Sequence, residues 1–132
     1  MTIKHFVPPD LPINACLDEL AQALEAGHVI LSAPTGSGKT PVVPISLLDQ
    51  PWLTGKKMIM LEPRRPAARM AAHRMAYLLG EKTGNTVGYQ VRFVRKISSD
   101  TRVEVLTEGL LLKRLQSDPE LSGVGLIIFD EF

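Results

Sequence analysis

The sequence of 132 residues is poor in the residues that mark secreted and membrane proteins. It contains a single cysteine, Cys16, so no disulfide can form within the chain, which favours a reducing compartment. Its apolar runs are far shorter than the roughly 20 residues that a spanning helix needs. The N-terminus lacks the basic stretch and apolar run of a secretion signal. We therefore expect a cytoplasmic protein with no part in a membrane.

Aromatic residues and net charge are also scarce. Phe, Trp and Tyr make up 5% of the chain, and the formal net charge is +1. A low aromatic content argues against a surface on which nucleic-acid bases stack. A charge near zero gives no general attraction to nucleic acid, so any such contact must come from local groups of Arg and Lys.

What remains is the composition of one ordinary globular domain, with 45% apolar and 22% charged residues. Proline blocks a helix near the start, and we expect an irregular segment over residues 1–12 and one domain over residues 13–132. Apolar spacing predicts helices over 13–26, 38–49, 65–79 and 107–116, and strands over 28–33, 57–62, 87–93, 102–106 and 125–130. This alternation predicts an α/β fold with a mostly parallel sheet covered on both faces.

A phosphate-binding loop follows the first predicted strand and precedes a helix, which is the context that the motif requires. Its glycines let successive backbone N–H groups point at phosphate oxygens, and the helix directs its positive end to the same place. Its lysine would contact the outer phosphates of ATP, and its threonine hydroxyl would bind Mg²⁺. The motif consists of Ala33, Pro34, Thr35, Gly36, Ser37, Gly38, Lys39 and Thr40, with Ala33 where the usual motif has Gly.

Two acidic residues, Asp130 and Glu131, follow the last apolar run. A buried strand would deliver Asp130 to the carboxyl edge of the sheet beside the phosphate loop. There Asp130 would hold Mg²⁺, and Glu131 would orient or deprotonate the attacking water. Alone the pair is a weak signal, because apolar strands often end in acids. With the phosphate loop upstream it indicates ATP hydrolysis, with Lys39 and Glu131 as the catalytic residues.

The motifs taken together resemble those of the DEAH-type superfamily 2 helicases, and most closely the bacterial HrpB-like group. The phosphate loop resembles helicase motif I, and residues 61–65 (Leu-Glu-Pro-Arg-Arg) resemble motif Ia. Residues 107–109 (Thr-Glu-Gly) resemble motif Ib, and residues 130–132 (Asp-Glu-Phe) resemble the start of motif II. Phe132, where most DEAH proteins have Ala, is a feature of the HrpB-like group. The resemblance covers essentially the whole chain.

This resemblance implies a RecA-like P-loop fold of three layers (α/β/α), which pairs with a second RecA-like domain around ATP and moves along a single strand, usually RNA. It also implies roles for four residues. Arg64 and Arg65 would lie on the nucleic-acid face, Thr107 would contact a backbone phosphate, and Arg74 would stack on the adenine. Arginine forks and capped helix starts suit such sequence-independent phosphate contacts.

The resemblance places further elements after Phe132, including a strand between the phosphate-loop strand and the strand of Asp130. We therefore expect the sheet of this chain to be incomplete at the C-terminus. The chain alone should neither unwind nucleic acid nor hydrolyse ATP efficiently, and its exposed strand edges could allow self-association.

Three alternatives stay open on the residues alone. The first is a P-loop ATPase that translocates or remodels without unwinding. The second is a nucleotide-gated module that binds nucleic acid without turnover, although intact Asp130 and Glu131 argue against it. The third is a small-molecule kinase, which is disfavoured because nothing resembles an acceptor-binding lid. The sequence does not identify the RNA or the polarity of movement.

Overall fold

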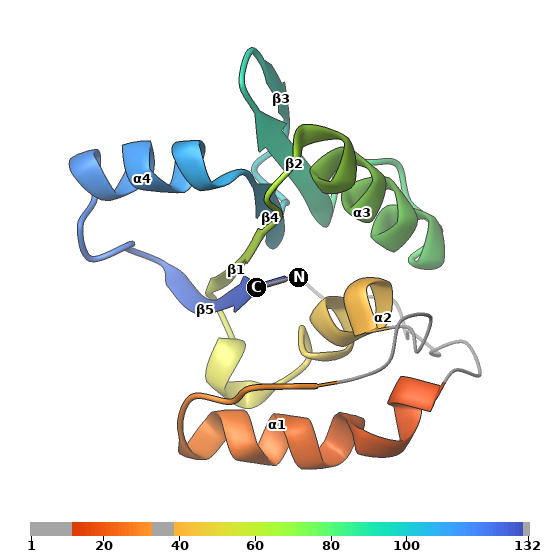
Figure 1. Ribbon diagram of the computed structural model, residues 1–132. Coiled ribbons are helices and arrows are strands. Elements are labelled where there is room, and N and C mark those ends of the chain that lie inside the picture. The colour runs from red at the N-terminus through yellow and green to blue at the C-terminus, as the bar shows by residue number, and fades with distance from the viewer. Residues whose placement is uncertain (1–11, 33–38, 131–132) are drawn as a thin grey trace.

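The computed structural model describes residues 12–32 and 39–130, which form a five-stranded sheet with helices on both faces (Figure 1). The strand order is β3-β2-β4-β1-β5. All neighbours are parallel except β2 and β3, which form an antiparallel pair. The strands are β1 (Lys57–Leu61), β2 (Val87–Val91), β3 (Val94–Lys96), β4 (Val103–Leu106) and β5 (Val124–Phe129). The predicted α/β fold with a mostly parallel sheet is confirmed.

The central strands form because they are apolar on both sides, as a parallel sheet covered by helices requires. Met58 and Met60 of β1 pack into one apolar cluster, and Ile59 and Leu61 pack into another on the opposite face. Every residue of β4 is buried as well. This alternation with a period of two fixes which side chains can meet the helices on each face.

Within the described residues, three helices share the apolar cluster on one face of the sheet, and one helix packs on the other face. The larger cluster contains residues of α1 (Leu17–Ala26), α2 (Lys39–Ser46) and α3 (Arg65–Leu78). The smaller contains Leu111 of α4 (Glu108–Ser117). Figure 1 shows α3 and α4 on opposite sides of the strands. The predicted three layers are therefore present, and the layer of α4 is thin.

An ion pair helps to hold α4 on the sheet. Glu104 of β4 is 2% exposed, and it accepts a hydrogen bond of 2.5 Å from Arg114 of α4. Its other oxygen lies 3.6 Å from Nζ of Lys57 on β1. Leu111 is the one buried side chain of α4 and Leu115 packs beside it, so the ion pair adds a polar contact to a small apolar one.

The predicted strand over residues 28–33 is wrong for the described residues 28–32. They carry no strand pairing, and Ile30 is 98% exposed. The reason is that a strand needs a neighbour with which to pair. A cavity lies between this segment and β5, the nearest strand along the sheet.

Several element ends differ from the predictions by one residue, and three differences are more informative. The first helix begins as a 3-10 helix, η1 (Pro12–Cys16), before α1, so the predicted irregular segment of residues 1–12 does not extend through residue 12. Residues 1–11 lie outside the described part of the chain. The predicted strand over 87–93 ends at Val91, where a two-residue turn leads into β3. Phe93 in this turn has a φ of 71° and is 89% exposed. Helix α2 ends at Ser46, and residues 47–49 form a turn instead of its last helical turn.

Candidate functional site

The site is built around the first turn of α2, where Lys39 and Thr40 lie. Both residues are partly buried. Pro41 is tolerated there because N–H groups of a first turn have no helical partner. Six residues of the predicted phosphate loop precede this turn and lie outside the described part of the chain, so their roles stay predictions. They are Ala33, Pro34, Thr35, Gly36, Ser37 and Gly38.

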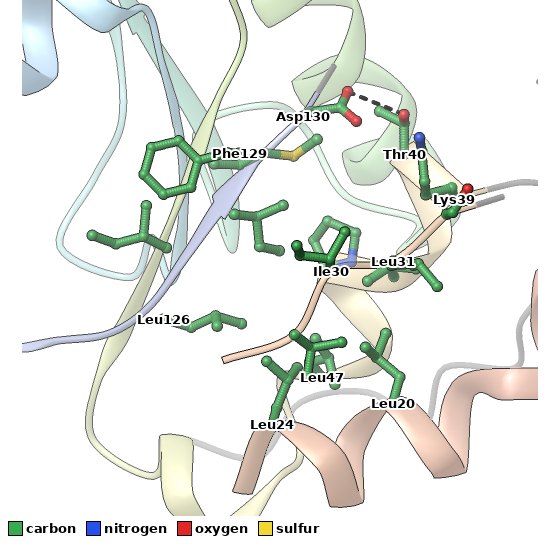
Figure 2. A pocket seen from close by; sticks show the side chains of 17 residues that line it. Leu20, Leu24, Ile30, Leu31, Lys39, Thr40, Leu47, Leu126, Phe129 and Asp130 are labelled. Carbon is green, nitrogen blue, oxygen red and sulfur yellow. Dashed lines mark hydrogen bonds between the residues drawn. The ribbon is translucent and has the colours of Figure 1, made fainter. Parts of the chain in front are cut away.

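Asp130 meets this turn from the opposite end of the sequence. The Thr40 hydroxyl donates a hydrogen bond of 3.2 Å to Oδ2 of Asp130, across 90 positions of the chain (Figure 2). Asp130 is held there because its backbone N–H donates to the carbonyl oxygen of Leu61 at 3.2 Å, which continues the pairing of β5 with β1. The predicted meeting of the phosphate loop with the C-terminal acid is thus present at Thr40 and Asp130.

The two side chains that meet fit a magnesium ion. A hydroxyl and a carboxylate are the hard oxygen donors that Mg²⁺ takes, and Mg²⁺ commonly binds through one or two such groups together with substrate phosphates. The residues described contain no cluster of three or more His, Cys, Asp or Glu that would form a complete protein cage. The predicted water-activating residue, Glu131, is outside the described part of the chain.

A cavity of about 670 Å³ opens between residues 29–32 and β5 (Figure 2). Lys39, Thr40 and Asp130 occupy its polar end. Apart from Ser32 the rest is apolar, with side chains from α1, α2 and the turn after it, β5 and the segment before the phosphate loop: Leu20, Leu24, Val29, Ile30, Leu31, Val43, Leu47, Leu126 and Ile128. Only the polar end has the chemistry of a nucleotide site, because the apolar part offers phosphates no donors.

The residues predicted to contact nucleic acid follow the ends of β1 and β4. Arg64 is the N-cap of α3, Arg65 is its first residue, and both are exposed. Thr107 occupies the N-cap position of α4, as predicted, but its side chain makes no capping hydrogen bond. The carboxyl ends of neighbouring parallel strands share one edge of the sheet. The structure therefore puts all three residues at the edge where Asp130 lies.

Arg74 lies on the exposed face of α3, and its guanidinium is 5.5 Å from the centre of the Tyr77 ring. This cation–π contact holds a planar group at the surface of the helix. The adenine contact predicted for Arg74 stays a prediction.

Sequence reasoning gave no role to Glu62, although it lies within the motif Ia stretch. Its side chain is 2% exposed, which is unusual for a carboxylate. The available signal was a charged residue that directly ends an apolar strand and precedes Pro63 and two arginines. Periodicity could not show that the side chain is covered.

Comparison with known proteins shows the family. The model of the DEAD/DEAH box helicases matches residues 16–132. The ATP-dependent RNA helicase HrpB of Escherichia coli is 55% identical over 92% of this chain. The ATP-dependent RNA helicase DEAH13 of Arabidopsis thaliana is 36% identical over the same share. Two crystal structures of E. coli HrpB superpose with TM-scores of 0.89, at 53% and 51% identity, over 93% and 97% of the chain.

These relatives are much longer than this chain. It spans 15% of HrpB and 10% of DEAH13 in sequence, and 16% of each solved HrpB chain. The helices of the described part include none long and apolar enough to cross a membrane. Motifs, sheet and comparisons agree, and the chain belongs to the DEAD/DEAH-box helicase family, with the α/β fold of the HrpB helicase domain.

Proposed function

We propose that this chain is the ATP-binding part of an ATP-dependent RNA helicase that couples ATP hydrolysis to movement on single-stranded nucleic acid. The observation that carries the proposal is the hydrogen bond between Thr40 and Asp130, because it joins the phosphate-loop helix to the acid of motif II. The relatives named ATP-dependent RNA helicases support the same activity.

In this proposal Lys39 contacts the outer phosphates of ATP, and Thr40 and Asp130 hold Mg²⁺. When bound, Mg²⁺ would neutralise charge on the phosphates. Glu131 orients the attacking water, and Arg74 stacks on the adenine. Lys39 and Thr40 begin α2, so its N–H groups and positive end would face the same anion.

Nucleic acid would bind along the same edge of the sheet, with Arg64 and Arg65 on backbone phosphates and Thr107 beside them. Such contacts are independent of base sequence and weaken as salt rises. The partners would be single-stranded RNA and a second RecA-like domain, and the protein would work in the cytoplasm.

The test is binding of a fluorescent ATP analogue with Mg²⁺ to the chain and to Lys39→Ala. We expect saturable binding that Lys39→Ala weakens at least about tenfold, which corresponds to about 1.4 kcal/mol. Lys82→Ala is the matched control, since Lys82 is an exposed lysine after α3. Equal binding by all three proteins would remove the phosphate loop from the mechanism.

The alternative functions are separated by assays on the complete protein. A remodelling ATPase would consume ATP without separating strands, and a nucleotide-gated module would bind nucleic acid without consuming ATP. For the chain alone we expect neither unwinding nor efficient ATP hydrolysis. Turnover comparable to that of the complete protein would contradict this expectation.

We further propose that the chain can self-associate through the edge of β5. In the described residues β5 pairs only with β1, so its other edge faces the cavity. Val124–Phe129 carries no charge, and a flat apolar edge invites pairing with another chain. Ile30 adds an exposed apolar side chain beside it.

A further inference from the structure

Two buried glutamates lie on β4 and directly after the neighbouring strand β1, and the ion pair described above involves only the one on β4. Glu104 and Glu62 are each 2% exposed. A buried carboxylate is costly unless other groups stabilise its charge. Glu104 meets Arg114 and Lys57 on the face of α4. Glu62 comes directly after β1, where the sheet meets the candidate site. The burial of its carboxylate is therefore not accounted for by the ion pair with α4.

The backbone around Glu62 joins the two halves of the site. Asp130 donates its N–H to the carbonyl oxygen of Leu61 at 3.2 Å. Glu62 donates its own N–H to the carbonyl oxygen of Leu106 at 3.0 Å, and Leu106 directly precedes Thr107. The ends of β5, β1 and β4 are thus connected in one row. Through these two backbone hydrogen bonds, the peptide of residues 61–62 connects Asp130 with the residue that precedes the N-cap of α4.

Extended by one residue past the end of β1 at Leu61, the alternation assigns Glu62 to the face that carries α2. Ile59 and Leu61 pack on the side of α4, whereas Met58 and Met60 pack on the side of α2 and α3. With a period of two, residue 62 follows Met60. Its carboxylate therefore lies on the same side of the sheet as the helix that begins with Lys39 and Thr40.

We propose that Glu62 is a positioning residue that couples the nucleotide site to the nucleic-acid surface. This inference rests on the function proposed above. A buried carboxylate must keep its stabilising contacts whenever the protein is folded, so it holds the end of β1 in one arrangement. Two residues later the chain reaches Arg64. A bound phosphate that displaces the arginines then also moves the end of β1, because the turn between them cannot change shape independently. Asp130 moves with the end of β1.

The test measures how single-stranded oligouridylate changes the affinity of the chain for the fluorescent ATP analogue with Mg²⁺. We expect the oligonucleotide to tighten binding of the analogue by about fivefold, the low end of the range for coupled sites. In Glu62→Gln this factor should fall to about two, because bonds to a neutral amide are weaker than bonds to a carboxylate. Glu62→Ala should bring it to about one. The affinity of Glu62→Gln for each ligand alone should stay within about threefold of the original.

Glu104→Gln is the matched control, because it removes a carboxylate of equal burial from the next strand. It should lower stability and leave the coupling factor unchanged. Circular dichroism checks that each variant is folded. If Glu62→Ala does not fold, the test rests on Glu62→Gln.

The outcomes separate the inference from the proposed function. A Glu62→Gln protein that keeps the full coupling factor overturns the inference, and so does an original chain that binds both ligands without coupling. In both cases nucleotide binding that depends on Lys39 would remain. If the original chain binds no analogue, or binds it without needing Lys39, the proposed function fails and the inference fails with it.

Discussion

Glycines in this sheet differ in how well they tolerate substitution by alanine, according to the atoms that an added Cβ would meet. A Cβ added to Gly88 of β2 would collide with the carbonyl oxygen of Lys96 and come within 2.8 Å of Cγ2 of Ile97. A backbone oxygen in a paired strand cannot move aside. We expect Gly88→Ala to lower the free energy of unfolding by about 1–3 kcal/mol, the usual range for overpacking. Denaturant unfolding followed by circular dichroism measures this loss.

Gly125 of β5 is the control for that prediction. A Cβ there would come within 2.8 Å of Cδ1 of Leu53 and 2.9 Å of Cδ of Lys56. Lys56 is exposed and its chain end can move aside, and Leu53 is buried but can shift its terminal methyl, so Gly125→Ala should cost less than Gly88→Ala, about 1 kcal/mol. Equal losses in the two variants would show that contact with the backbone is not the deciding factor.

At the scale of elements, α4 depends on its ion pair. Arg114→Met would leave the buried Glu104 with Lys57 alone, at 3.6 Å. Removing one partner of a fully buried pair costs about 3–5 kcal/mol. Because the Arg114 side chain is 28% exposed and Lys57 remains, we expect a smaller loss of about 2 kcal/mol in thermal or denaturant unfolding.

The double variant Glu104→Met with Arg114→Met tests the cause. It removes the buried charge together with its partner, and apolar replacements of buried pairs are often neutral. The double variant should therefore recover most of the stability lost by Arg114→Met. A double variant less stable than Arg114→Met would mean that the charges themselves hold α4 in place.

At the scale of the whole molecule, the proposed self-association depends on the edge of β5 that pairs with no other described strand. We expect the apparent mass of the chain in light scattering to rise with concentration, and Ile30→Lys to abolish the rise, because a charge beside an open edge opposes pairing. Folding should be little affected, since Ile30 is 98% exposed. Met70→Lys is the control. Met70 is an exposed apolar residue of α3, away from β5, and this variant should associate like the original chain. A monomer at every concentration would refute the proposal.

Elements with a strong local pattern could be predicted closely from the sequence. The first strand and the helix beginning at Arg65 end within one residue of where apolar spacing, Pro63 and Gly80 predict. The short strand β3 could not be predicted, because all residues of Val94–Lys96 are exposed and the strand owes its conformation to pairing with β2. The strand expected over 28–33 is wrong over the described residues 28–32 for the converse reason, since no described strand pairs with them.

The candidate site divides in the same way. The identities of Lys39, Thr40 and Asp130 were determined by the sequence, because their chemistry is local and each follows a recognisable strand or loop. Only the tertiary structure decided that Thr40 and Asp130 touch across 90 positions, and that Glu62 is buried where β1 ends between β4 and β5. Contacts and burial of this kind depend on the order of strands in the sheet, and strand order is a property of the assembled fold and not of any segment alone.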